Sequence, residues 1–175
     1  MAKMYRYTLG IDPSGAFKEG SGTTGWCLLD NETNVVLKAG TISAKNYKTY
    51  HEYWEAHTNL IKHLNKSYYS LAVSIEDYIL YKNHAMSQVN SQLETVQLLG
   101  IIKQFCWSYA LDYFIRPAVA VKKRWSDEIL EHKHIIAPKG KLFILPHTGE
   151  VICEHTRDAI RHAIHFNTFE NKEVT

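Results

Sequence analysis

The stretch LGIDPSGAFKEGSGTTGWCLLD, residues 9–30, decides the fold class of this chain. It contains an apolar segment that ends in Asp12, a loop rich in glycine and serine, and a second apolar segment. Short apolar runs bounded by turn residues are typical of β-strands. An acidic residue at the end of a strand can form a turn, lie in a phosphate site or bind a metal ion. The rest of the sequence has to distinguish these roles.

The bulk composition is that of an ordinary globular protein. The chain has 175 residues, 45% hydrophobic and 22% charged, with a formal net charge of +2. We therefore expect one domain over residues 1–175, with a disordered polar tail at residues 170–175. Three widely spaced cysteines indicate no disulfide framework. No apolar run is long enough for a membrane span and no signal peptide is visible, so we expect a cytoplasmic protein without a membrane partner.

The hydrophobic pattern predicts the order of the elements. Strands are expected at residues 4–11, 24–29, 34–42, 70–77 and 113–118. Helices are expected at residues 47–65, 87–109, 120–132 and 156–169, and a hairpin or loop at 138–151. The first three strands form an antiparallel meander, which helices and strands then follow. This order predicts an α/β fold, with a mixed five-stranded sheet and helices packed on its faces.

Acidic residues recur at the ends of these elements. Asp12 ends the first strand, Glu76 lies at the end of the fourth, and Asp158 lies near the start of the last helix. His155 precedes Asp158 by three residues, which is about one helical turn. If the first and fourth strands are neighbours, Asp12 and Glu76 meet at the same edge of the sheet, where the last helix can add Asp158.

Converging carboxylates favour a metal site. Their charges repel one another unless cations lie between them. Mg²⁺ prefers such oxygen ligands, and two ions about 4 Å apart can activate water and stabilise the leaving oxygen of a phosphodiester. Each acid also has an ordinary alternative. Asp12 can be a turn residue, Glu76 a solvated strand end, and Asp158 a first-turn acid that interacts favourably with the helix dipole.

A basic stretch is compatible with a polyanionic partner. Residues 97–125 contain five basic residues and one acidic residue. Such local charge fits a nucleic acid, although it also fits a solvated lysine-rich surface.

Five segments of the chain are similar to the RuvC family of Holliday-junction resolvases, which has the RNase H-like fold. They follow the family order: GIDPSG with TGWCLLD, VSIEDYILYKN, TVQLLGII, IRPAVAVKK and HTRDAIRHAIHF. The first resembles the opening Gly-Ile-Asp-Pro-Gly of the family, and the last resembles its closing Asp-Ala helix. The resemblance implies a crossover junction endodeoxyribonuclease that acts in DNA recombination and repair.

The resemblance also implies roles for single residues. Asp12, Glu76 and Asp158 match the metal-binding carboxylates of the family, and His155 matches its remaining catalytic position, which can bind metal or position the attacking water. The implied cofactor is Mg²⁺, with two ions for each active site and Mn²⁺ as a substitute. The implied enzyme is a homodimer that uses the helix at residues 87–109 and nicks two like strands of a four-way junction.

Further residues are expected to contact DNA. Aromatic or apolar side chains are expected to lie against the junction bases, and basic side chains to contact phosphates without reading sequence. These residues are Tyr78, Ile79, Tyr81, Lys82, Lys122, Lys123, Arg124 and Arg157. For the aromatic positions, core packing at the strand end is the alternative.

Two segments depart from the family pattern. The loop at residues 13–23 is longer than the turn of the family, and residues 126–154 do not resemble its helical segment. We therefore expect a version encoded by a phage or mobile element that also accepts forks and three-way junctions.

Other functions remain open at the level of sequence. One is an RNase H-like nuclease that acts on another substrate, such as an RNA–DNA hybrid. A second is a phosphotransferase of the actin or sugar-kinase type, although that fold needs two such domains. A third is a DNA-binding protein without catalysis. It could be an inactive nuclease fold or a zinc module that uses His132, His134, His147, Cys153 and His155.

Overall fold

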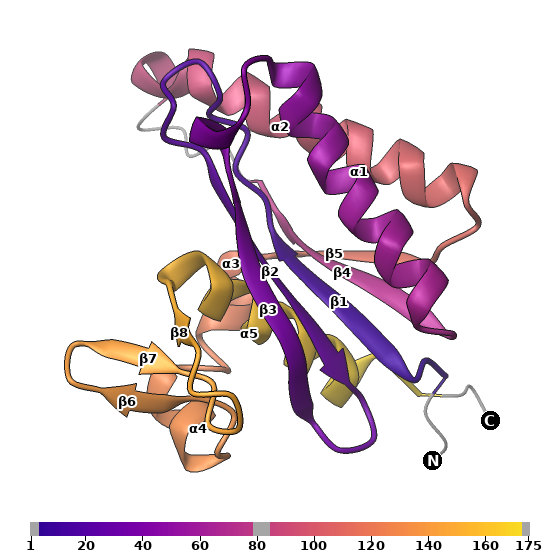
Figure 1. Cartoon of the computed structure of the whole chain (residues 1–175), viewed down its shortest axis with the longest axis vertical. Helices are drawn as coiled ribbons and strands as arrows, with labels where there is room; N and C mark the ends of the chain where they lie inside the picture. The colour runs from indigo at the N-terminus through magenta and orange to yellow at the C-terminus, as the bar shows by residue number, and fades with distance from the viewer. Residues whose placement is uncertain (1–3, 79–84, 173–175) are drawn as a thin grey trace.

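The computed structural model describes residues 4–78 and 85–172, without the side chains of residues 85–92. Its main sheet has the strand order β3-β2-β1-β4-β5 (Figure 1). The five strands are β1 (Tyr7–Asp12), β2 (Thr23–Asp30), β3 (Val35–Ser43), β4 (Leu71–Asp77) and β5 (Tyr113–Pro117). β1, β2 and β3 pair antiparallel, whereas β4 pairs parallel with both β1 and β5. The predicted mixed sheet with an N-terminal meander is confirmed.

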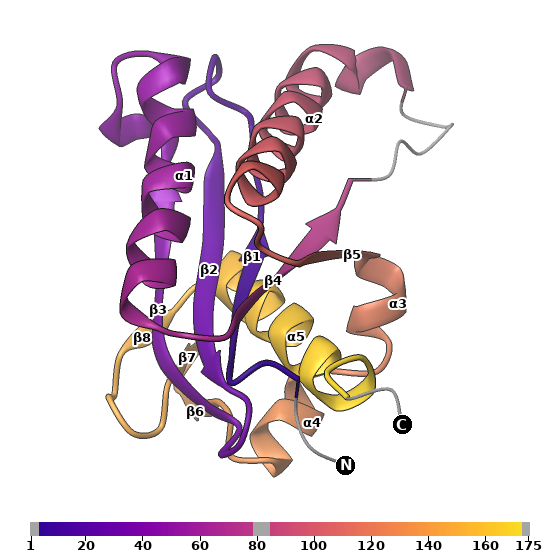
Figure 2. The ribbon, with the colours of Figure 1, turned by 90° about the vertical axis from the view of Figure 1, so that its right-hand side faces the viewer.

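Helices cover both faces of this sheet, as predicted (Figure 2). They are α1 (Tyr50–Ser67), α2 (Ala85–Ser108), α3 (Ala118–Lys122), α4 (Asp127–His132) and α5 (Glu154–Phe169), and a 3₁₀ helix spans Ala44–Asn46. The apolar side chains of Leu9 and Ile11 in β1 join a core cluster with α1 and α2. Cys27 and Leu29 in β2 instead join a cluster with α5. In the described residues, no helix is long and apolar enough to span a bilayer.

Capping sets where α1 begins. The sequence predicts a helix from residue 47, but Thr49 has an extended backbone and α1 begins at Tyr50. The Glu52 N–H donates to the Thr49 hydroxyl, and the Glu52 carboxylate accepts from the Thr49 N–H. This reciprocal pair is a capping box, which fixes the start of the helix.

The prediction of one helix at residues 120–132 is wrong. α3 ends at Lys122 and α4 begins at Asp127. Ser126 adopts an extended conformation (φ −63°, ψ 164°), and Asp127 and Glu128 lie in the first turn of α4. Such an acidic first turn is a helix-start signal, so two short helices replace one.

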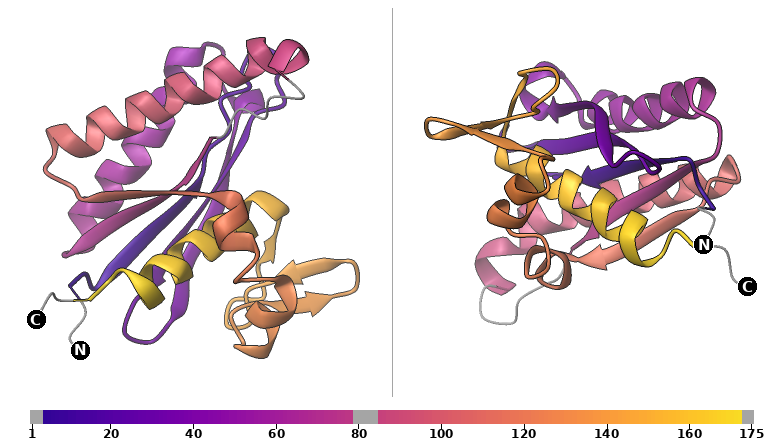
Figure 3. Two further views of the ribbon diagram at one scale, coloured as in Figure 1. Left: turned by 180° about the vertical axis from the view of Figure 1, so that it is seen from behind. Right: turned by 90° about the horizontal axis from the view of Figure 1, so that it is seen from below.

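A second, smaller sheet follows α4. It contains β6 (Ala137–Lys139), β7 (Leu142–Ile144) and β8 (Val151–Ile152), all antiparallel. The hairpin prediction for residues 138–151 is thus confirmed in outline and gains a third strand. Figure 3 shows β6 and β7 extending away from the body. Leu145 and Ile152 nevertheless share a core cluster with α5.

The expected disorder does not apply to the first residues of the tail. Asn171 is fully buried. Its side chain accepts from the Tyr5 N–H at 2.7 Å and donates to the Tyr5 carbonyl at 2.8 Å. A paired polar side chain loses less on burial than an unpaired one, so this contact holds residues 170 and 171 against the N-terminal segment.

Candidate active site

The alternation of side chains along two strands selects which residues face α5. In β1, Ile11 enters the core under α1 and α2, so its neighbour Asp12 points to the opposite face. In β4, Ile75 likewise faces α1 and α2, and Glu76 faces the other way. Since β1 and β4 are parallel neighbours, their ends present both carboxylates at one edge of the sheet.

Two glycines let α5 approach these strand ends closely. A Cβ atom at Gly10 would lie 2.1 Å from the Ala159 carbonyl oxygen, and one at Gly25 would lie 2.1 Å from the His155 carbonyl carbon. Gly25 is paired with Asp12 across β1 and β2. Only glycine fits at such distances, so this spacing sets the first turn of α5 directly over Asp12.

Asp12, Glu76 and Asp158 form a triad of carboxylates. One oxygen atom from each lies within 4.8 Å of the others. Asp12 and Asp158 are buried, and Glu76 is half-buried. Burial raises the pKa of Asp12, and the charge of Glu76 adds to this effect, while the hydrogen bond from His155 opposes it. The three acids predicted from the sequence therefore meet at one point.

His155 contacts the triad through Asp12. Its Nδ1–H donates to Asp12 Oδ2 at 2.7 Å, and its side chain is 46% exposed. The hydrogen bond to Asp12 raises the pKa of His155, although burial opposes this shift. In the neutral tautomer that this bond favours, Nε2 carries the lone pair and can accept a proton from solvent.

Basic residues compensate the charge of Asp158. Lys122 Nζ lies 2.7 Å from Asp158 Oδ2. Arg161 donates to the other oxygen of Asp158 and to Asp127, and its Nε donates to the Trp125 carbonyl at 2.8 Å. Burial opposes the charged form of Lys122, but the hydrogen bond to Asp158 and the nearby carboxylates raise its pKa. The position of Arg161, three residues after Asp158 in a helix, is the signal that sequence reasoning overlooked.

His162 supports Glu76 from within the core. It is 1% exposed, and its Nε2–H donates to Glu76 Oε2 at 3.2 Å. Its backbone carbonyl accepts from the Ser74 hydroxyl at 3.0 Å, which ties α5 to β4. The sequence analysis did not identify His162, although its place four residues after Asp158 puts both on one helix face.

The residues predicted to contact DNA lie in different settings. Tyr78 is half-buried and packs against the core cluster under α1 and α2. Arg124 lies 4.8 Å above the Phe169 ring, and Arg157 lies 3.2 Å from Asp127. Exposed Lys123 has no such partner in the described parts of the chain. Ile79, Tyr81 and Lys82 lie outside the described residues.

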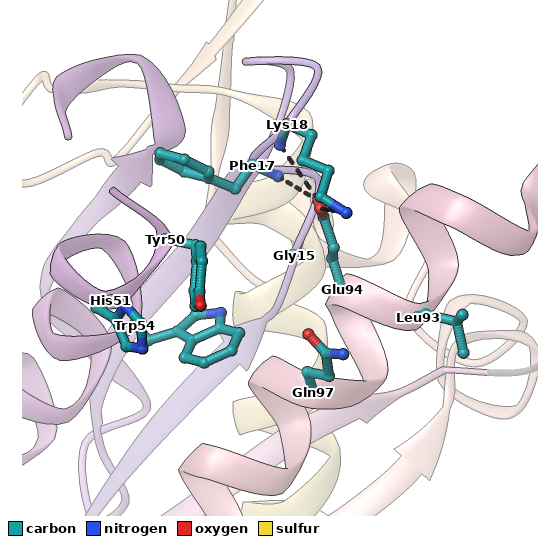
Figure 4. A pocket seen from close by; sticks show the side chains of 9 residues that line it. All are labelled: Gly15, Phe17, Lys18, Tyr50, His51, Trp54, Leu93, Glu94 and Gln97. Carbon is teal, nitrogen blue, oxygen red and sulfur yellow. Dashed lines mark hydrogen bonds and ion pairs between the residues drawn. The ribbon is translucent and has the colours of Figure 1, made fainter. Parts of the chain in front are cut away.

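Hydrogen bonds to α2 hold the long loop that follows Asp12. The Gly15 N–H donates to Thr95 Oγ1 at 3.0 Å, and the Phe17 N–H donates to Glu94 Oε2 at 2.9 Å. Figure 4 shows Glu94 reaching from α2 to the backbone of this loop. The loop and both helices enclose a pocket of about 440 Å³, lined by Gly15, Phe17, Lys18, Tyr50, His51, Trp54, Leu93, Glu94 and Gln97.

A second anchor of this loop comes from α1. The buried His57 donates through Nδ1 to the Tyr53 carbonyl at 2.7 Å and accepts from the Thr24 hydroxyl at 2.8 Å. Thr24 Oγ1 accepts from the Ser14 N–H, and the Tyr53 hydroxyl donates to the Ser14 carbonyl at 2.6 Å. The residues directly after Asp12 are therefore held from both helices.

The zinc alternative lacks an assembled site in the described residues. The triad of Asp12, Glu76 and Asp158 is the group of possible metal ligands found there, and the histidines proposed as zinc ligands form no such group. All three cysteines are free: Cys27 and Cys106 are buried, and Cys153 is exposed at the N-cap of α5.

The triad has the chemistry of a site for a hard divalent cation. It offers carboxylate oxygens, which Mg²⁺ and Mn²⁺ prefer. Burial is the main cause of the raised pKa of Asp12, and the charges of Glu76 and Asp158 add to it, so a cation beside these three acids would be favourable. A divalent ion would be held by Asp12, Glu76 and Asp158.

Comparison with known proteins identifies the fold. No family model and no curated protein matches the chain. Solved structures do match. T. thermophilus RuvC in complex with a Holliday junction substrate is 14% identical, with 91% of each chain covered and a TM-score of 0.66. A second Thermus thermophilus RuvC structure is 14% identical, with 90% of this chain and 91% of that chain covered and a TM-score of 0.57. The chain therefore has a divergent RuvC-like fold of the RNase H-like class.

Proposed function

We propose that this protein is a metal-dependent endonuclease that hydrolyses phosphodiesters near the branch point of DNA. Four-way junctions are its first substrate, and forks and three-way junctions are further ones. The observation that carries the proposal is the triad of carboxylates within 4.8 Å of one another, on a fold shared with a protein solved on a Holliday junction. The three free cysteines fit a reducing compartment, in keeping with a cytoplasmic enzyme.

The residues of the site divide the chemistry among them. Asp12, Glu76 and Asp158 would hold two Mg²⁺ ions, or Mn²⁺ in their place, and such ions would supply activation of water and stabilisation of the leaving oxygen. His155, fixed by its bond to Asp12, accepts the proton of the attacking water at Nε2. Lys122 Nζ, 2.7 Å from Asp158 Oδ2, pairs with this carboxylate.

The deciding test is cleavage of a labelled four-way junction by the wild type and by Glu76→Gln, with Mg²⁺ and with Mn²⁺. The substitution keeps the size of the side chain and removes its charge. We expect the variant to bind the junction but to cut more than about 100-fold more slowly, because even partners behind the ligands contribute about 10–100-fold. Asp77→Asn is the matched control, since it removes a neighbouring charge that is not in the triad.

Other outcomes select other functions. Cleavage of an RNA–DNA hybrid in preference to the junction would indicate a different RNase H-like nuclease. Junction binding without cleavage by the wild type would indicate a DNA-binding protein on a nuclease fold. Equal cleavage by the wild type and Glu76→Gln would remove the triad from the mechanism.

We further infer a homodimer that forms through α2. Large apolar side chains on this helix face solvent: Leu93 is 54% exposed, Val96 46% and Trp107 74%. They lie on one stripe with Gly100, where a Cβ would meet no atom within 4 Å. We expect light scattering to show a dimer for the wild type and a monomer for Val96→Glu. Val119→Glu, at an exposed valine outside α2, leaves the dimer intact.

A further inference from the structure

Most of the basic side chains near the triad have partners within the protein. Of Lys122, Lys123, Arg124 and Arg157, only Lys123 has no ion pair or ring contact with the described residues. A DNA duplex carries about one charge for each 1.7 Å of its length. A protein that holds a DNA arm firmly therefore needs further unpaired cations close to the site.

The small sheet supplies such cations at its tip. Residues 132–149 contain three lysines, three histidines and no acidic residue. Lys139 and Lys141 flank Gly140, whose φ of +63° forms the turn between β6 and β7. Both lysines are exposed, and neither has an ion pair or ring partner in the part of the chain that the structure describes. The third, Lys133, lies 5.9 Å from the centre of the Trp125 ring.

Contacts at the base fix the direction of the two-stranded β6–β7 ribbon (residues 137–144). Leu145, directly after β7, is fully buried in the core cluster that includes α5. The His147 Nε2–H donates to the Val36 carbonyl at 2.6 Å, which ties the small sheet to β3. The Arg157 guanidinium lies 4.6 Å from the centre of the Phe143 ring. The ribbon is thus attached both to the main sheet and to α5.

The ribbon also lies next to the helix turn that carries the site. Phe143 in β7 pairs with Ile152 in β8, and α5 begins two residues later, just before His155. Lys141 precedes Phe143 by two residues, which places it about 7 Å along the strand toward the tip of the ribbon. In Figure 1 the ribbon projects outward below the start of α5.

We propose that the β6–β7 ribbon binds the phosphate backbone of a duplex arm of the branched DNA, through Lys139 and Lys141. This inference rests on the proposed function and adds a contact to it. A two-stranded ribbon fits the DNA major groove, which is about 12 Å wide, and lysines at its tip reach the phosphates on the rim. The ribbon lies in the segment where the sequence departs from the RuvC family.

The test measures how the affinity for a labelled four-way junction depends on salt, with Glu76→Gln as the background that prevents cleavage. The variant adds Lys139→Gln and Lys141→Gln. Lys62→Gln with Lys66→Gln is the matched control, because these lysines are exposed on α1 and carry the same charge. Two lost phosphate contacts should reduce the slope of log affinity against log salt by about 1.8, and weaken binding on the order of tenfold or more at 0.1 M salt.

A series of junctions with one arm shortened locates the contact. In Glu76→Gln with both ribbon lysines intact, the affinity for the junction falls once the phosphates that the ribbon reaches are removed. In the ribbon variant, the same truncation has no further effect, because the contact is already lost. Equal effects of the ribbon and α1 variants, or wild-type affinity and slope in the ribbon variant, overturn the inference while leaving the proposed function standing. If neither the wild type nor Glu76→Gln binds any DNA, this inference and the proposed function are both overturned.

Discussion

At the scale of residues, each acid of the triad has its own nitrogen partner. His155 donates to Asp12 and His162 donates to Glu76, while a lysine and an arginine share the two oxygens of Asp158. Buried carboxylates are costly unless they are paired. These partners allow the chain to fold with three acids at one point before a divalent ion binds.

His162 allows a sharp test of this arrangement. His162→Leu removes the N–H that orients Glu76, so we expect Mn²⁺ affinity to fall about 10–100-fold. His162→Gln keeps a donor and should restore most of the affinity. A Mn²⁺ titration followed by electron paramagnetic resonance checks both. His165→Leu is the control, because His165 contacts Glu170 and no acid of the triad. Equal losses in the Leu and Gln variants would contradict an orienting role.

At the scale of elements, the site depends on how closely α5 lies on the sheet. At Gly10 and Gly25, backbone atoms of α5 occupy the space that a Cβ atom would need. Asp158 and His155 both lie in the first two turns of α5, so any shift of its start moves them together relative to Asp12.

Gly25→Ala should therefore separate folding from activity. The added Cβ would lie 2.1 Å from the His155 carbonyl carbon, so the start of α5 has to move. We expect a loss of cleavage of about 100-fold, as a misplacement near 1 Å can produce, together with weaker Mn²⁺ binding and a native circular dichroism spectrum. In Gly100→Ala the new Cβ meets no atom of the same protomer within 4 Å, so Mn²⁺ binding stays unchanged and the helix gains up to about 1 kcal/mol. Wild-type cleavage by Gly25→Ala would show that the spacing is not required.

The hydrogen-bond network around His57, which holds the loop after Asp12, makes the stability of the protein depend on pH. Burial lowers the pKa of His57 from 6.5 to about 4. In the unfolded chain His57 takes up a proton near pH 6.5, whereas the folded protein resists it until about pH 4. Stability therefore falls as pH decreases through this window, by about 3 kcal/mol in total.

Urea unfolding between pH 8 and pH 4 measures this contribution. We expect the free energy of unfolding of the wild type to fall by about 3 kcal/mol more than that of His57→Gln over that range. The variant has no titrating group at this position. His63→Gln, which removes an exposed histidine of the same helix, should retain the wild-type pH dependence. Parallel curves for the wild type and His57→Gln would mean that folding does not lower the pKa of His57.

At the scale of the whole molecule, the triad joins parts that are distant in the sequence. β1, β4 and α5 each contribute one acid, and an ion bound by all three links the first strand to the last helix. A ligand that binds only the folded state raises its stability. Metal binding and global stability are therefore coupled.

Thermal unfolding with and without Mg²⁺ tests this coupling. At a Mg²⁺ concentration about 100 times the dissociation constant, we expect the free energy of unfolding to rise by about 2.7 kcal/mol. This corresponds to an unfolding midpoint roughly 5–10 °C higher. Chelation with EDTA should reverse the shift, and Glu76→Gln should abolish it. An equal shift in Glu76→Gln would place the bound ion elsewhere.

Local patterns predicted the main sheet and the triad, because both depend on strand ends and helix starts. The end of β1 at Asp12 and the position of Asp158 in the first turns of α5 follow from short-range signals. The partner of Lys122 could not be predicted in this way, because Asp158 is far from it in the sequence. The break between α3 and α4 was missed because the apolar pattern continues through Trp125, which is buried.

The cysteines have a practical consequence for spectroscopy. Burial raises the pKa of Cys27 and of Cys106 to about 12, so neither thiol reacts readily. Cys153 is exposed directly before the first turn of α5. A maleimide dye should therefore label the native protein at one position, two residues from His155. Its emission would report directly on metal and DNA arriving at the site, without any engineered cysteine.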